Sequence, residues 1–244
     1  MQRLSGGKKA VLLELIRKGV SINKIAKRSG LAKSTIYYHY KKALGKKYKE
    51  PEFEVAFSEL EGETTGIFAG DGSLHYSKSN WQYEVNVHFG KEKYALYVKE
   101  LFERRFNKKF RLQKETLNRL RLRTQDRKIF NAFYNYLDFE RTHKHDTVKL
   151  KKLDFSKEFN IGFLRGLLDT DGTACHTKQG RVITYYTTSL ELAKQIKSLL
   201  LGLNMETGWY EDSRPGYKTL YHVKIRKKDN DRFLGLIKPF KAMN

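Results

Sequence analysis

Two aspartates lie 100 residues apart in segments of similar sequence. TTGIFAGDGSL spans residues 64–74 and LRGLLDTDGTA spans residues 164–174, and the aspartate before the last glycine is Asp71 in one and Asp171 in the other. Two carboxylates that converge repel each other unless a cation lies between them. Hard divalent ions such as Mg²⁺ bind oxygen ligands, and a pair of them can hydrolyse a phosphodiester by activating water and stabilising the leaving oxygen. The pair therefore predicts metal-dependent phosphodiester hydrolysis.

The residues before each aspartate predict a helix pair that brings the two carboxylates together. Small residues lie four apart, at Gly66 and Gly70 and again at Gly166 and Thr170. Residues four apart share one face of a helix, and small residues on that face let two helix backbones approach closely. We expect the two helices to pack around a pseudo-two-fold axis. The glycine after each aspartate lets the chain leave its helix sharply.

Each aspartate segment is followed by the same order of predicted elements. A hairpin at 73–89 and a helix at 91–106 follow the first, and a hairpin at 173–187 and a helix at 189–204 follow the second. Two more strands and a helix come next in both copies. A matching order over about 100 residues indicates a duplicated unit. The predicted fold class is α+β.

The first 45 residues predict a small all-α domain. Apolar spacing indicates three short helices, at 8–18, after Ser21 and at 33–43, with Gly30 in the turn before the third. This pattern resembles a helix-turn-helix, whose third helix lies in the major groove. An ordinary three-helix bundle or a protein-docking module remains an alternative. The expected DNA contacts on the third helix are Lys33, Ser34, Tyr37 and Lys41.

Composition points to a nucleic acid as the partner. The chain has 49 Lys and Arg against 27 Asp and Glu, which gives a net charge of +22, and a phosphate backbone is the commonest acidic partner of such a protein. No apolar run approaches the roughly 20 residues of a membrane helix, and the charged N-terminal segment does not resemble a signal peptide. The single cysteine, Cys175, excludes an intramolecular disulfide. We expect a cytoplasmic or organellar protein in a reducing compartment, neither secreted nor bound to a membrane.

The two aspartate segments resemble the paired motifs of the LAGLIDADG homing endonucleases. The resemblance covers residues 55–244, as repeat 1 at 55–150 and repeat 2 at 151–244, after a helix-turn-helix domain at 1–45 and a linker at 46–54. It implies duplicated αββαββα units with pseudo-two-fold symmetry in a monomer. It also implies that each unit places a curved sheet in the major groove of a long asymmetric DNA target, and that both strands are cut across the minor groove.

The resemblance also implies roles for individual residues. Asp71 and Asp171 would bind Mg²⁺ or Mn²⁺, together with the backbone carbonyls of Gly70 and Thr170. A basic residue near each scissile phosphate follows the last helix of each copy, and Lys144 and Lys241 lie at about these places. The family often has a second acidic residue two places before the catalytic one. The second copy has Asp169 there, whereas the first copy has Ala69, and Thr64 replaces the usual leading apolar residue.

The strands of both units predict a polar face that suits DNA. Polar and apolar side chains alternate in 82–89, 119–123 and 221–226, and alternate residues point to opposite faces of a sheet. Arg can form two hydrogen bonds with guanine, and Asn or Gln can do so with adenine. A solvated surface strand alternates in the same way, so both interpretations stay open. The candidate contacts are Gln82, Asn86, His88, Arg119, Arg121, Arg123, His222, Lys224 and Arg226.

Two other functions fit the same residues. A sequence-specific DNA-binding regulator could keep this fold without cleavage, although the presence of both aspartates argues against it. An RNA maturase, which assists the splicing of the intron that encodes it, would use a basic sheet on intron RNA. A nicking assay with Mg²⁺ on a bound target separates the first alternative from the endonuclease, and RNA binding identifies the second.

Overall fold

A computed structural model describes residues 4–45, 56–77, 81–178 and 180–243. The chain divides into two compact units, Met1–Glu52 and Phe53–Asn244. The linker predicted at 46–54 lies outside the described residues. No helix in the described part of the chain is long and apolar enough to cross a membrane.

The N-terminal unit consists of three short helices, α1 (Gly6–Arg17), α2 (Ile22–Ser29) and α3 (Lys33–Leu44). The Ser21 hydroxyl accepts a hydrogen bond from the Lys24 amide at 3.3 Å and so caps α2. Gly30 ends α2 with a φ of +67°, in the left-handed region that favours glycine. The unit has its own small core, made of Leu12, Ile16, Ile25 and Ile36.

The second unit contains the predicted duplication, and the αββαββα order is confirmed. The first copy comprises α4 (Glu59–Asp71), β1 (Gly72–Ser77), β2 (Gln82–Phe89), α5 (Glu92–Phe106), β3 (Arg111–Thr116), β4 (Arg119–Gln125) and α6 (Arg127–Ala132). The second comprises α8 (Lys157–Asp171), β7 (Gly172–Thr177), β8 (Gly180–Thr187), α9 (Leu190–Gly202), β9 (Thr207–Asp212), β10 (Leu220–Ile225) and α10 (Asn230–Ile237).

Short elements join and follow the two copies. The joining segment contains η1 (Phe133–Asn135), β5 (Leu137–Asp138), η2 (Arg141–His143), α7 (Lys144–Thr147) and β6 (Lys149–Leu150). In the second copy η3 (Lys227–Asp229) precedes α10, and α11 (Phe240–Met243) follows it. The two lysines predicted near the scissile phosphates, Lys144 and Lys241, lie on α7 and α11.

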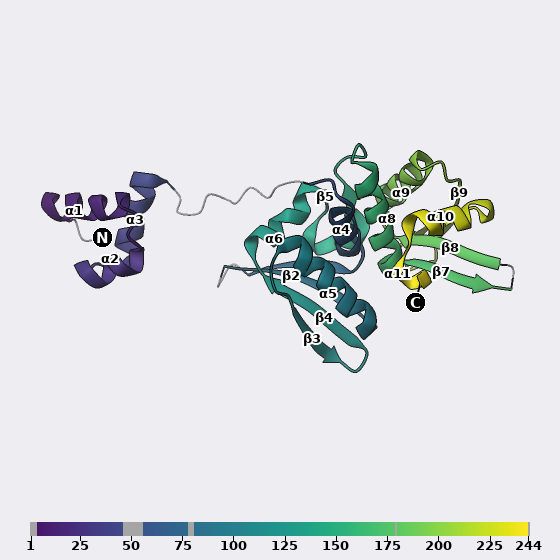
Figure 1. Cartoon of the computed structure of the whole chain (residues 1–244), viewed down its shortest axis with the longest axis horizontal. Coiled ribbons are helices and arrows are strands. Elements are labelled where there is room, and N and C mark those ends of the chain that lie inside the picture. Colours follow the sequence, from purple (N-terminus) through teal and green to yellow (C-terminus); the bar gives the residue numbers. More distant parts are fainter. Residues whose placement is uncertain (1–3, 46–55, 78–80, 179, 244) are drawn as a thin grey trace. The chain divides into compact units, whose positions relative to one another are not determined.

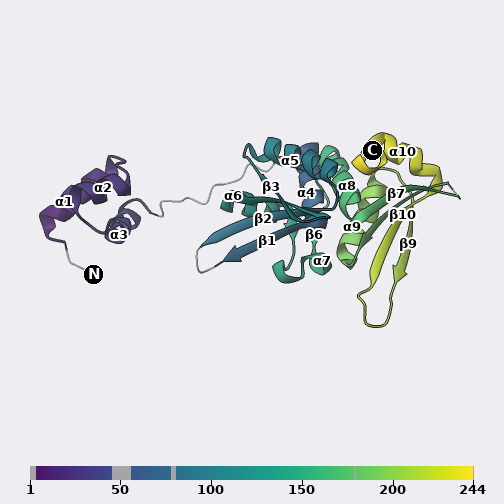
Figure 2. The ribbon, with the colours of Figure 1, turned by 90° about the horizontal axis from the view of Figure 1, so that it is seen from below.

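Each copy forms a four-stranded antiparallel sheet of the same topology. The strand order is β1-β2-β4-β3 in one and β7-β8-β10-β9 in the other. The register pairs Leu74 with Val85 and Val87 with Leu122, which puts the apolar side chains of neighbouring strands on one face. This face joins the helices in one continuous core that extends through both copies. Figures 1 and 2 show α4 and α8 side by side between the two sheets.

Glycines bring the backbones of α4 and α8 into direct contact. A Cβ atom at Gly66 would lie 2.2 Å from the carbonyl oxygen of Phe163, and one at Gly166 would lie 2.2 Å from that of Glu63. The close contact extends one turn further than predicted, to Gly62 and Gly162. Because no side chain fits there, glycine at these positions allows the helices to pack and brings their C-terminal ends together.

Two buried carboxylates on α4 have charged partners on neighbouring helices. Glu63 is 3% exposed, and it pairs with Arg165 of α8 at 3.0 Å and accepts a hydrogen bond from the Tyr97 hydroxyl. Glu61, 2% exposed, pairs with Arg105. A buried charge without a partner would be strongly destabilising, so the Glu63–Arg165 pair makes the contact between α4 and α8 specific as well as close. The Glu61–Arg105 pair instead joins α4 to α5 of the same copy.

Candidate active site

The two predicted carboxylates lie at matching ends of the helix pair. Asp71 is the last residue of α4 and Asp171 the last residue of α8, and a glycine begins a strand directly after each. Burial, and to a smaller extent the charge on Asp171, raise the pKa of Asp71 from its ordinary value of 3.8 to about 6. Burial also raises the pKa of Asp171. The site therefore holds two half-buried acids whose negative charges oppose each other.

Each helix end also carries a lysine ammonium. Lys144 is buried, and its Nζ donates to the carbonyl oxygens of Phe68, Ala69 and Gly70 at 2.9, 2.5 and 2.8 Å. Lys241 donates in the same way to the carbonyls at the end of α8, as described below. Burial lowers the pKa of Lys144 to about 8, against the opposing effect of the two aspartates. A cation at a helix C-terminus is favourable because the last carbonyls have no partner within the helix.

Asp169 helps to place Lys241 at the end of α8. The lysine Nζ donates to the carbonyls of Thr170 and Gly172 at 3.1 and 2.9 Å. The Asp169 carboxylate, 2% exposed, accepts hydrogen bonds from the backbone amides of Phe240 and Lys241, both at 2.9 Å. Asp169 therefore fixes the segment that carries Lys241. Ala69 has no side chain that could make these bonds in the first copy.

Substituting Asp169 with alanine should loosen the C-terminal segment. Each lost hydrogen bond contributes about 1 kcal/mol to stability, so we expect the amides of Phe240 and Lys241 to exchange their hydrogens about tenfold faster. Hydrogen exchange measured on C-terminal peptides checks this. Asp154→Ala, which removes a carboxylate that is 79% exposed, is the control and should leave the exchange unchanged. Unaltered protection in Asp169→Ala would show that the carboxylate does not hold this segment.

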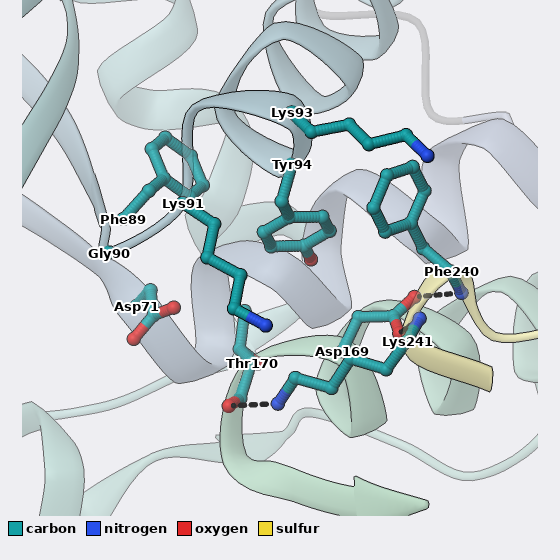
Figure 3. A pocket seen from close by; sticks show the side chains of 10 residues that line it. All are labelled: Asp71, Phe89, Gly90, Lys91, Lys93, Tyr94, Asp169, Thr170, Phe240 and Lys241. Carbon is teal, nitrogen blue, oxygen red and sulfur yellow. Dashed lines mark hydrogen bonds between the residues drawn. The ribbon is translucent and has the colours of Figure 1, made fainter. Parts of the chain in front are cut away.

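The two aspartates line different cavities. Asp71 lines a cavity of about 320 Å³ together with Asp169, Thr170, Tyr94 and three lysines, Lys91, Lys93 and Lys241, as Figure 3 shows. Asp171 lines a second cavity of about 440 Å³ together with Gly70, His145, Tyr186 and Thr188. The cavity residues of α5 are not among the predicted site residues, because the helical spacing of Tyr94 is typical of a core residue.

The donors at the helix ends fit a hard divalent cation. Two carboxylates and the carbonyls of Gly70 and Thr170 are all oxygen ligands, which Mg²⁺ and Mn²⁺ accept. Each of these carbonyls already accepts a lysine hydrogen bond, but a carbonyl oxygen has a second lone pair. Among the described residues, no group of three or more His, Cys, Asp and Glu side chains could hold a metal. Two carboxylates with water as further ligands match the preference of Mg²⁺ for sites that keep several waters.

The outer face of the first sheet is partly covered by its own ion pairs. Arg123 pairs with Glu84 at 2.6 Å, and Arg121 pairs with Glu115 at 3.1 Å. Asn86 lies on this face but is only 6% exposed, which makes it the only buried residue among the contacts predicted on this sheet. Strand alternation assigns a residue to a face, but the neighbouring side chains determine whether it is accessible. The other candidates of this sheet are exposed or half-buried, namely Gln82, His88, Arg119, Arg121 and Arg123.

The outer face of the second sheet has a different chemistry. The His222 ring lies between Tyr186 and Tyr210, with ring centroids 4.8 and 5.1 Å away, and Lys224 and Arg226 are exposed beside it. The first sheet therefore presents arginines paired with glutamates, and the second presents aromatic rings and exposed cations. In the N-terminal unit, the predicted contacts on α3 are all exposed, namely Lys33, Ser34, Tyr37 and Lys41.

Comparisons with known proteins agree with this architecture. Residues 158–238 match the LAGLIDADG-like domain, and residues 3–42 match the helix-turn-helix domain of resolvase. No curated protein matches the sequence. The chain therefore carries a LAGLIDADG-like domain after a helix-turn-helix.

Solved structures with the same fold include DNA-bound proteins. I-DmoI in complex with DNA and Mn has a TM-score of 0.58 at 19% identity, over 75% of this chain and 97% of that one. The homing endonuclease I-WcaI bound to its DNA recognition sequence has a TM-score of 0.50 at 16% identity, over 82% and 92%. The N-terminal LAGLIDADG domain of DUF199/WhiA has a TM-score of 0.52 at 14% identity, over 75% and 82%. At these identities the likeness establishes the LAGLIDADG fold.

Proposed function

We propose that this chain, a LAGLIDADG protein with an N-terminal helix-turn-helix, is a site-specific DNA endonuclease of the homing type. It makes a double-strand break in a long asymmetric target by divalent-metal-dependent hydrolysis. The observation that carries the proposal is the pair of carboxylates, Asp71 and Asp171, at adjoining ends of two helices in direct backbone contact. Each helix end also has a lysine ammonium. A binding protein without cleavage would have no need of two half-buried carboxylates that repel each other.

The chain's own residues supply the ligands and the positive charge of the reaction. Mg²⁺ or Mn²⁺, when bound, would polarise the phosphate and make water a stronger nucleophile. Asp71 and Asp171 would hold the cation with the carbonyl oxygens of Gly70 and Thr170. The ammonium groups of Lys144 and Lys241 would offset part of the charge that builds on the phosphate. The backbone contact of α4 and α8 and the lysine hydrogen bonds to their last carbonyls would hold these groups in place before DNA binds.

The two unlike sheets suit a target whose halves differ in sequence. The arginines of β4 can form paired hydrogen bonds with guanine edges, once DNA replaces their glutamate partners. The face around His222 instead offers aromatic rings and cations for apolar and phosphate contacts. Two sheets of different chemistry recognise two different half-sites, and a single chain that contains both sheets needs no partner subunit.

The helix-turn-helix supplies further contacts outside the endonuclease unit. Residues 1–45 contain eleven Lys and Arg residues and a single acidic residue, Glu14. In a domain that matches the helix-turn-helix of resolvase, α3 would lie in the major groove. The few side chains that α3 presents would read a short flank beyond the main target.

A binding selection and a cleavage assay test the proposed function. The Asp71→Asn/Asp171→Asn double variant is used to select duplexes from a randomised library, so that bound DNA is not cut. The unmodified chain is then incubated with a selected duplex and Mg²⁺. Cleavage of both strands within the site supports the endonuclease. Binding without cleavage would favour a regulator, and preferential binding of structured RNA would favour a maturase.

A fragment that contains only residues 53–244 should cut the same position as the full chain. It loses the cations of the N-terminal unit, and each lost phosphate contact reduces the slope of log K against log salt by roughly 0.9. We therefore expect weaker binding with a flatter salt dependence. Footprinting of both forms on one long selected duplex should show protection that shrinks at one end only.

The opposite outcome would reverse the division of roles between the units. If the fragment cuts DNA at many positions or not at all, while it remains folded by circular dichroism, the helix-turn-helix is the main reader of the target. A variant of the full chain that loses only contacts of α3 is the matched control. Lys33→Ala/Lys41→Ala in the full chain should flatten the salt dependence less than the deletion does.

A further inference from the structure

Tyr94 has a buried hydroxyl without a hydrogen-bond partner beside one of the two carboxylates. Its ring packs against Phe89 and Phe240, with ring centroids 5.7 and 5.3 Å away. Its hydroxyl oxygen is buried and has no partner among the described residues. Figure 3 shows the hydroxyl directed to the side of the cavity where Asp71 and Asp169 lie. A buried hydroxyl without a partner is unfavourable, so it suits a ligand that supplies the missing acceptor.

The walls of this cavity suit an anionic acceptor. Lys91, Lys93 and Lys241 all line it, and the first two extend from the start of α5, where the chain leaves β2. Three ammonium groups and one hydroxyl are the donor set that commonly binds a phosphate. The two carboxylates of the cavity would oppose an anion, but Asp71 is the proposed metal ligand, and Asp169 is already bonded to two backbone amides.

The cavity of Asp171 has no such donor set. When α5 and α9 are aligned on their buried small residues, Ala95 and Ala193, Leu192 takes the place of Tyr94. Leu192 is 1% exposed and has no polar group to offer. No lysine is among the described residues that line the second cavity, where His145 is the basic side chain. The two halves of the site are therefore chemically different although the backbone is duplicated.

We infer that Tyr94 is a phosphate-binding residue of the Asp71 half of the site. Its hydroxyl donates a hydrogen bond to a non-bridging oxygen of a backbone phosphate in one DNA strand, and Lys91 and Lys93 offset the charge of that phosphate. The other strand, which meets the Asp171 half, receives no equivalent contact. This inference rests on the proposed function and adds that the two strands are held and cut by unequal sites.

Tyr94→Phe keeps the packed ring and removes only the hydroxyl. A hydrogen bond to a charged group is worth about tenfold to a hundredfold in rate or binding. We expect the variant to nick one strand of a selected duplex that much more slowly in Mg²⁺, with each strand labelled separately, and to nick the other at the normal rate. Tyr97→Phe is the matched control, because it makes the same change one turn along α5, where the hydroxyl bonds to Glu63. It should leave the ratio of the two strand rates unchanged.

A binding measurement without metal tests the same contact independently of cleavage. Neutral methylphosphonate is placed at one phosphate at a time across the centre of each strand of the selected duplex. At one position we expect the methylphosphonate to weaken binding by the unmodified chain about tenfold. The same methylphosphonate should leave the affinity of Tyr94→Phe unchanged. Tyr94 contacts the phosphate whose replacement removes the difference in affinity between the two proteins.

The outcomes separate this inference from the proposed function. If the unmodified chain cuts both strands and Tyr94→Phe slows them equally or not at all, Tyr94 has no strand-specific contact and the inference fails alone. If every methylphosphonate weakens both proteins alike, the phosphate contact is also refuted. If the unmodified chain cuts neither strand, the proposed endonuclease fails, and the methylphosphonate series still decides whether Tyr94 binds a phosphate.

Discussion

Changing Asp71 or Asp171 to asparagine is expected to abolish double-strand cleavage while the protein still binds its target. Asparagine keeps the shape of the side chain but removes the negative charge that would hold a divalent cation. Loss of one such electrostatic group typically costs a hundredfold or more in rate. The predicted base contacts lie on the sheets, away from the helix ends, so affinity for a selected duplex should change little.

The same substitutions should raise stability in the absence of metal. Burial and the opposing carboxylate raise the pKa of Asp71 to about 6. At neutral pH, ionised Asp71 therefore has a higher free energy in the folded protein than in the unfolded chain. A neutral amide removes that cost, as is common where catalytic groups are held in unfavourable surroundings. Strand-resolved cleavage and thermal unfolding are measured together. The exposed Asp154→Asn serves as the control, with cleavage and unfolding temperature unchanged. Near-normal cutting of both strands by Asp171→Asn would contradict the assignment of the metal site.

The substitution Gly66→Ala, which adds a single methyl group, is expected to disrupt the helix pair. The added Cβ would lie 2.2 Å from a backbone oxygen of α8, so the backbones must move apart. Overpacking of a core costs about 1–3 kcal/mol. We expect the upper end of that range or more, because the clash involves backbone and cannot be relieved by rotating a side chain. The displaced helix ends would also separate Asp71 from Asp171 and abolish cleavage.

Gly235→Ala is the matched control for that experiment. Gly235 also lies within a helix, α10, but a Cβ there would meet nothing within 4 Å. Alanine is favoured over glycine in a helix by roughly 0.5–1 kcal/mol, so the control should be slightly more stable than the original chain. Both tryptophans of the chain, Trp81 and Trp209, lie in the second unit, so fluorescence during urea unfolding reports on the affected part. Equal stability of the two variants would contradict the direct backbone contact.

The helix pair and its duplication could be predicted from the sequence because they depend on local spacing. Gly66 and Gly166 mark the contacting faces, and the period of 100 residues relates the two copies. The same spacing of four extends back to Gly62 and Gly162, so this part of the contact is also encoded locally. The hairpins and their apolar faces also follow from alternation, since the strand pleat alone determines which side chains share a face.

The details of the site depend on contacts between distant segments, which spacing does not reveal. Asn86 is buried on the face where Arg123 and Glu84 pair across neighbouring strands, and alternation within one strand does not show such neighbours. The bonds from Asp169 to the amides of residues 240 and 241 join segments about 70 residues apart. Tyr94 fits the apolar pattern of α5, and only the assembled cavity shows that its hydroxyl has no partner.

Cleavage of a selected duplex by the unmodified chain, with and without Mg²⁺, tests the central proposal most directly. Both strands are labelled, and the products are mapped to single-nucleotide resolution. We predict one cut in each strand within the bound site when Mg²⁺ is present, and an intact, bound duplex when Mg²⁺ is removed by a chelator. Specific binding without a cut in either strand at any concentration of Mg²⁺ or Mn²⁺ would contradict the proposal that this protein is an endonuclease.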